Sequence, residues 1–120
     1  MPVRSLNSSV LRWPDLKTVD RAVRTWADAI ARLRPEVLRI GYFGSYARGD
    51  WGVGSDLDLI VIVDESELPF VRRGIGWDTD SLPVPTDLLV YTKEEWKALQ
   101  DKGRFSKMLS SDTVWVHTRE

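Results

Sequence analysis

Between positions 14 and 34, apolar residues recur every three or four residues, which is the spacing of one face of a helix. Pro14 and Asp15 suit the first turn of a helix, and Pro35 cannot continue one. The pattern therefore predicts a helix that ends near Arg34. Its apolar stripe is formed by Leu16, Val19, Val23, Trp26, Ile30 and Leu33, and charged residues occupy the opposite face.

Four shorter segments have the composition of β-strands. Residues 37–43 and 57–63 are mostly apolar, and the second is so continuously apolar that we expect a central strand covered on both faces. Residues 86–91 and 113–118 predict two further strands. Helices and strands therefore alternate along the chain.

The C-terminal third contains a second helix signal. Thr92 followed three residues later by Glu95 fits a capping box, and Gly103 suits the end of the helix that follows. Apolar residues at 105, 108 and 109 predict another short helix. Two segments are less regular: residues 1–13 predict an N-terminal arm or an edge strand, and residues 68–83 predict at most a helical turn or two.

Composition limits the classes of protein to which the chain can belong. A length of 120 residues fits one domain, and no linker or repeat divides it, so we treat residues 1–120 as a single domain. A net charge of −1 argues against a general nucleic-acid binder. The chain has no cysteine, no signal-like start and no apolar run of membrane-spanning length, so we expect a cytoplasmic protein that does not bind membranes.

The chemistry-bearing residues are concentrated between positions 44 and 58. Gly44-Ser45 follows the first predicted strand, where backbone N–H groups at the start of a short helix can hold a phosphate. Ten residues later, Asp56 and Asp58 project from one face of the second strand, because side chains alternate along a strand. An isolated pair of this kind is often a solvated turn, but here it follows a phosphate cradle.

A third carboxylate, Asp87, lies within the otherwise apolar strand 86–91. A lone charge inside such a strand is costly unless it is paired or bound to a cation. Together with Asp56 and Asp58, it would form an oxygen-only site suited to magnesium, which also accepts substrate phosphates.

These motifs resemble those of the nucleotidyltransferase superfamily related to DNA polymerase beta. More narrowly, the run from Gly44 to Val61 is similar to the minimal nucleotidyltransferases, the antitoxin-like partners of HEPN-domain proteins. The resemblance implies an α+β fold with a mixed sheet flanked by helices, ATP as donor and two Mg²⁺ ions. It also implies transfer of AMP to a tyrosine hydroxyl of a partner HEPN ribonuclease, which silences the toxin.

The resemblance assigns a role to each motif residue. Asp56 and Asp58 would hold the metal on the triphosphate and share a second metal with Asp87, which would also accept the proton of the acceptor hydroxyl. Gly44 and Ser45 would bind the β and γ phosphates.

Arg48 could contact the triphosphate or, equally well, pair with Asp50. For the remaining candidates we favour packing over chemistry: Tyr42, Tyr46, Trp51, Trp77 and His117.

Two other functions remain open from the sequence. The protein could be a non-catalytic antitoxin that neutralises its partner by contact, or an adenylyltransferase that acts on a small hydroxyl compound. The irregular segment 68–83 is the region that we expect to shape acceptor recognition or a partner interface. The acceptor's identity and homo-oligomerisation are left open.

Overall fold

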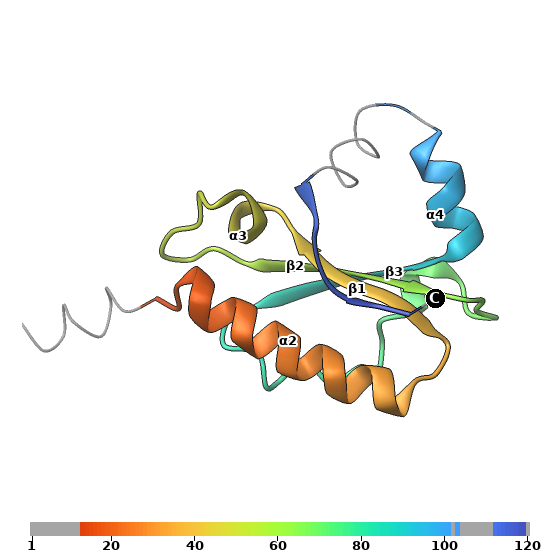
Figure 1. Cartoon of the computed structure of the whole chain (residues 1–120), viewed down its shortest axis with the longest axis horizontal. Coiled ribbons are helices and arrows are strands. Elements are labelled where there is room, and N and C mark those ends of the chain that lie inside the picture. The colour runs from red at the N-terminus through yellow and green to blue at the C-terminus, as the bar shows by residue number, and fades with distance from the viewer. Residues whose placement is uncertain (1–12, 102, 104–111, 120) are drawn as a thin grey trace, which may run out of the picture.

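The computed structural model describes residues 13–101, 103 and 112–119, which form one mixed four-stranded sheet with helices on both of its faces (Figure 1). The predicted arm before Trp13 and the predicted short helix at 105–109 lie outside the described residues. In chain order the elements are α2 (Leu16–Leu33), β1 (Val37–Phe43), α3 (Ser45–Arg48), β2 (Leu57–Val63), the 3₁₀ turn η1 (Phe70–Arg72), β3 (Thr86–Thr92), α4 (Lys93–Gln100) and β4 (Val114–Thr118).

The long helix α2 begins where the sequence predicts. Asp15 is its N-cap, and one oxygen of its carboxylate accepts a hydrogen bond from the Thr18 backbone N–H at 2.9 Å. The predicted stripe faces the sheet from Val19 to Ile30, but Leu33 is 77% exposed, so its place in the stripe was predicted wrongly. The helix ends at Leu33, and the side chain of this last residue lies in solvent and not in the core.

The sheet has the strand order β3-β2-β1-β4. β1 pairs antiparallel with both β2 and β4, whereas β2 pairs parallel with β3, so the sheet is mixed as predicted. Because alternate residues of a strand face opposite sides, β2 contributes to two cores. Its odd-numbered residues join the core under α2, while Ile60 and Ile62 join a smaller cluster with Trp96 of α4. This double coverage explains why the segment is so continuously apolar.

The helix α4 starts with the predicted capping box. The Thr92 hydroxyl accepts from the Glu95 backbone N–H at 3.2 Å, and the Glu95 carboxylate accepts from the Thr92 N–H at 2.8 Å. The box places the start of the helix directly after β3. In the described part of the chain, no helix is long and apolar enough to cross a membrane.

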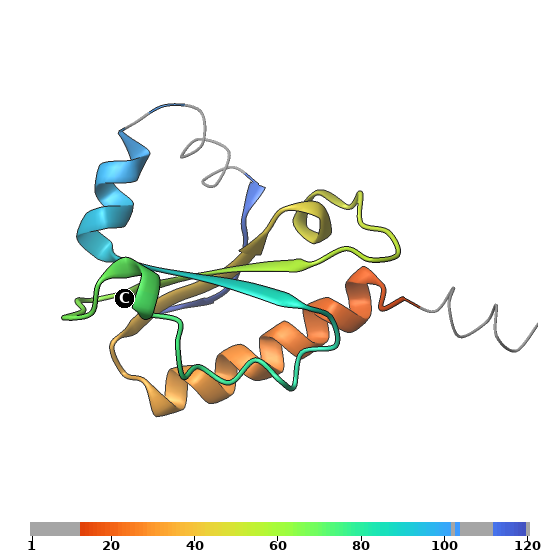
Figure 2. The same cartoon turned by 180° about the vertical axis from the view of Figure 1, so that it is seen from behind.

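Residues 64–85 leave the far end of β2, form the single turn η1 and then run beside α2 to reach the start of β3 (Figure 2). Trp26 of α2 secures this segment, because its indole N–H donates to the Asp78 carbonyl at 2.7 Å and its ring packs against Trp77. The segment therefore flanks the edge strand β3.

Candidate functional site: a carboxylate cluster beside a glycine turn

The three predicted carboxylates gather where β2 and β3 begin. In the parallel pairing, Asp58 lies directly opposite Asp87, and Asp56 precedes β2 by one residue. By strand alternation all three belong to the face that α4 covers, which is also the side on which α3 lies (Figure 1). Asp58 and Asp87 are 29 positions apart in sequence, and the pairing of β2 with β3 brings them together at one end of the sheet.

Asp58 is the most enclosed of the three carboxylates, and it is partly buried where Asp56 and Asp87 are exposed. Burial raises its pKa above the ordinary aspartate value, and the charges of Asp87 and Asp56 raise the pKa further, whereas Arg48 lowers it. The two neighbouring carboxylates are therefore close enough to oppose a negative charge on Asp58. A cation would relieve this repulsion.

The exposure of Asp87 corrects one step of the sequence reasoning. We expected a charge buried in an apolar strand, but Asp87 lies at the exposed start of β3. Its charge is therefore solvated and carries no desolvation cost that a cation would have to offset. Its position opposite Asp58 follows from the parallel register instead. The placement is as predicted, although the reason given for it was wrong.

Gly44 connects the carboxylates to the turn before α3. Its backbone has φ +78° and ψ −152°, and a Cβ at this position would lie 2.3 Å from Oδ2 of Asp58. That conformation is almost confined to glycine, and the contact leaves no room for a side chain. Glycine is therefore required here on two counts, and the turn sits directly against the Asp58 carboxylate.

The short helix α3 is held in place by Tyr46, which is fully buried. Its hydroxyl donates to the Pro14 carbonyl at 2.9 Å, and Trp51 stacks on its ring with 5.7 Å between centroids. These contacts confirm packing roles for Tyr46 and Trp51. Ser45 begins the helix, so its N–H lies among the first donors, which have no partner within a helix.

Arg48 forms the predicted pair with Asp50, and its contact with a triphosphate stays a prediction. Its Nε donates to Oδ2 of Asp50 at 3.2 Å, and the pair is exposed to solvent. Its charge also lowers the pKa of Asp58, so the guanidinium lies within electrostatic reach of the carboxylate cluster. Exposed pairs of this kind are weak, and Arg48 can exchange Asp50 for another anion.

Within the ranges that the structure describes, no group of three or more His, Asp or Glu side chains is arranged to hold a metal ion. The chemistry of the donor set nevertheless fits a hard cation, because all three candidates are carboxylates and two of them raise the pKa of the third. The metal site thus remains a prediction from residue type and placement.

The other aromatic and histidine candidates lie outside the carboxylate cluster or contact residues that do not belong to it. Trp77 packs against Trp26 and lies under the Arg34 guanidinium, 4.3 Å from the ring centroid. His117 lies on β4, which two strands separate from β3, so it is not part of the cluster. Tyr42 is buried and donates to Asp20 at 2.8 Å, which confirms its packing role.

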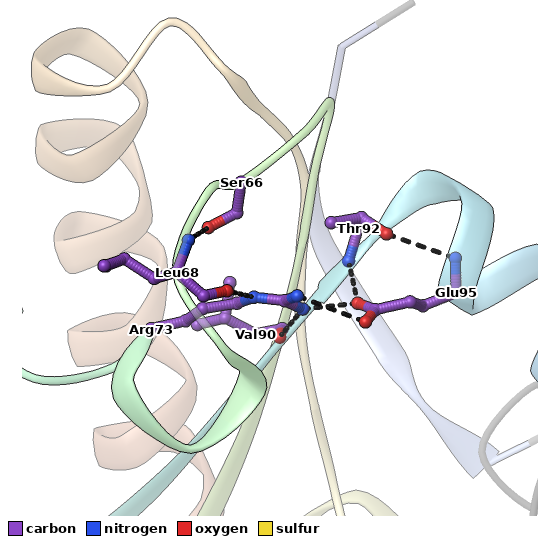
Figure 3. A network of polar contacts seen from close by, with 6 residues as sticks. All are labelled: Ser66, Leu68, Arg73, Val90, Thr92 and Glu95. Carbon is purple, nitrogen blue, oxygen red and sulfur yellow. Dashed lines mark hydrogen bonds and ion pairs between the residues drawn. The ribbon is translucent and has the colours of Figure 1, made fainter.

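The sequence analysis missed Arg73, whose side chain is only 9% exposed. Its guanidinium forms a double ion pair with Glu95, and it donates to the carbonyls of Leu68 at 2.9 Å and Val90 at 3.3 Å (Figure 3). Arg73 thus ties the segment after β2 to β3 and to the α4 capping box. An arginine in a glycine-rich stretch was the available signal, but its partners on β3 and α4, Val90 and Glu95, lie 17 and 22 residues away in sequence.

Comparisons with known proteins identify the family of the chain and match its fold. A family model described as a nucleotidyltransferase domain matches residues 23–115. A candidate nucleotidyltransferase from Sulfolobus solfataricus has a similar structure, with a TM-score of 0.63 and 19% identity over 87% of this chain and 84% of that one. A toxin–antitoxin solved with AMP-PNP is also similar, with a TM-score of 0.51 and 18% identity over 81% and 74% of the two chains. No curated protein has a matching sequence.

Proposed function

Because the chain belongs to the nucleotidyltransferase domain family, we propose that it transfers AMP from ATP to a hydroxyl group of a partner protein. One observation carries the proposal. Asp58 faces Asp87 across the β2–β3 pairing, and its carboxylate touches the glycine turn that opens α3. A site for a metal-bound triphosphate needs acidic and phosphate-binding groups side by side, and the adjacency of the carboxylates and the glycine turn supports such a site.

The proposed ATP-binding side of the site consists of the glycine turn at Gly44 and the cluster of three carboxylates. Gly44 and the N–H groups at the start of α3 would hold the β and γ phosphates, together with the Ser45 hydroxyl. Arg48 would leave Asp50 for the more highly charged triphosphate, because a charge-assisted contact with phosphate is stronger than an exposed ion pair. Asp56 and Asp58 would hold a magnesium ion on the triphosphate, and Asp87 would share a second.

Bound magnesium supplies charge stabilisation for the attacking and leaving oxygens. The residues of the chain orient the reactants and accept the proton. The acceptor oxygen forms a bond to the α phosphorus as the bond from that phosphorus to the bridging oxygen breaks. Pyrophosphate leaves with the electron pair, and the hydroxyl proton passes to the Asp87 carboxylate. Because Asp87 is exposed, that proton is then released to solvent.

The partner is inferred from a sequence resemblance and from one structural neighbour. The resemblance of the Gly44–Val61 run to minimal nucleotidyltransferases implies a HEPN-domain toxin as the acceptor. A structural neighbour is a toxin–antitoxin solved with AMP-PNP, which supports a nucleotide-binding antitoxin without identifying the partner of this chain.

The test is label transfer from [α-³²P]ATP, with magnesium, to the protein encoded beside this one. We expect the partner to be labelled by the wild type but not by the Asp56→Asn/Asp58→Asn variant. Asp64→Asn is the matched control, because Asp64 is an exposed carboxylate just beyond the opposite end of β2 and pairs with Lys93 at 2.7 Å. If the double variant neutralises its partner as well as the wild type does, the protein acts by contact. If only small hydroxyl compounds are labelled, the acceptor class is wrong.

A further inference from the structure

A groove of about 420 Å³ opens beside Asp87, between β3 and the segment that precedes it. Most of its lining is apolar, and Asp87 is the only charged residue among the described residues that line it. We call it the acceptor groove. Its apolar walls come from Phe70, Val71, Ile75, Trp77, Leu88 and Leu89.

The rim of the acceptor groove is exposed to an extent that is unusual for apolar side chains. Val71 is 81% exposed, Ile75 is 74% exposed and Phe70 is 38% exposed, all within one six-residue stretch. Single exposed apolar residues are common, but a cluster around a groove marks a surface that a partner covers.

The far half of β3 is already closed to a partner. The Val90 carbonyl accepts from Arg73 at 3.3 Å, so the preceding segment packs against this part of the strand. Nearer the start of β3, Gly74 lies beside Leu88, and both residues line the groove. The open part lies beside Thr86 and Asp87, next to the carboxylate cluster. Because Asp87 belongs both to the groove lining and to the carboxylate cluster, a chain seated in the groove lies beside the proposed reacting centre.

The wall that carries the apolar rim is fixed in position. Arg73 follows η1 directly, and its nearly buried guanidinium bonds to Glu95 of α4 as well as to the Leu68 and Val90 carbonyls (Figure 3). A wall that is held to both β3 and α4 does not need to be ordered when a partner binds, which lowers the cost of binding.

We propose that the acceptor groove binds the segment of the partner protein that carries the acceptor hydroxyl, and that it selects a hydroxyl flanked by apolar side chains. The proposal rests on the transferase function described above and defines its acceptor. Among the described residues that line the groove, the polar side-chain groups are those of Thr79, Thr86 and Asp87 and the indole N–H of Trp77. Apolar flanks therefore bury more of the apolar lining than polar flanks would. Apolar side chains on either side of the acceptor residue would pack on the apolar walls, and the acceptor hydroxyl would then lie next to Asp87.

The test uses two capped nine-residue peptides with one central tyrosine, flanked on each side by two leucines in one peptide and by two glutamines in the other. Binding is measured by fluorescence anisotropy without nucleotide, and labelling is measured with [α-³²P]ATP and magnesium. We expect the leucine peptide to bind at least about tenfold more tightly and to be labelled faster, since burying even part of several aliphatic side chains is worth that much.

The protein variants localise the effect. Val71→Gln/Ile75→Gln should weaken binding of the leucine peptide at least about tenfold and leave ATP affinity unchanged. Leu33→Gln is the matched control, because Leu33 is 77% exposed on α2 and does not line the groove. The proposal is overturned if both peptides bind equally, if neither binds, or if the groove variant behaves like the wild type.

Failure of the transferase function would look different. If the wild type neither binds ATP nor labels any protein, the proposed function is wrong, whereas the anisotropy measurement still reports on the groove. If ATP binds and the partner protein is labelled but the groove variant labels it at the wild-type rate, only the acceptor groove is wrong.

Discussion

Replacing Gly44 with alanine should damage the protein twice, through the backbone and through Asp58. The φ of +78° with ψ of −152° lies in a region that is essentially confined to glycine, at a cost of about 1–3 kcal/mol for another residue. The new Cβ would also lie 2.3 Å from Oδ2 of Asp58, and such overpacking costs about 1–3 kcal/mol. We therefore expect a total loss of about 2–6 kcal/mol in the free energy of unfolding.

Urea unfolding followed by tryptophan fluorescence measures this loss, with Gly49→Ala as the matched control. Gly49 also has a positive φ of +84°, but nothing lies within 4 Å of the Cβ that alanine would add. Gly49→Ala should therefore cost only the backbone strain, about 1 kcal/mol.

A double-mutant cycle with Asp58→Ala separates the two causes, because that change removes the oxygen with which the Cβ collides. In the Asp58→Ala background, Gly44→Ala should cost about 1–3 kcal/mol less than in the wild type. The reasoning is refuted if the two changes add within about 0.5 kcal/mol, or if Gly44→Ala is no more costly than Gly49→Ala.

Three further variants test the supports of the site. Tyr46→Phe removes the bond to the Pro14 carbonyl and should cost about 1 kcal/mol by urea unfolding, together with weaker magnesium-ATP binding; unchanged values would contradict a supporting role. The Arg73 hydrogen bond lowers the pKa of Glu95, so this carboxylate stabilises the fold above its unfolded pKa, and the stability is lost as the pH falls through the folded pKa. Glu95→Gln should therefore be destabilising at pH 7 and lose its effect in acid, whereas a pH-independent difference in unfolding midpoints would speak against the pair. Arg73→Lys keeps the charge but cannot reach all of its partners, so amide exchange in residues 68–75 should accelerate in mass spectrometry; unaltered exchange would exclude a bracing role.

Local patterns were sufficient for most of the secondary structure. The three-to-four-residue spacing predicted α2, and the apolar segments predicted β1 and β2 at the bounds that the structure has. The capping box at Thr92 was also readable, because both of its hydrogen bonds join residues three positions apart. Each of these features depends on neighbours in sequence, so no knowledge of packing was needed.

The site was readable only in part. Gly44-Ser45 and Asp56-x-Asp58 are recognisable by their spacing, and Asp87 was found as an unexpected charge in an apolar strand, although it is exposed. That Asp87 lies opposite Asp58 depends on the parallel register of β2 and β3, which a sequence pattern does not encode.

Contacts between distant segments came from the tertiary structure alone. The approach of Gly44 to Asp58, the Arg73–Glu95 pair and the acceptor groove each join residues that are brought together by how the strands and their connections pack. Spacing along the chain shows which residues can carry the chemistry, because periodicity and turn preferences act over a few residues. Which of them meet, and what surface lies beside them, is decided when the sheet forms and the segment before β3 packs against its edge.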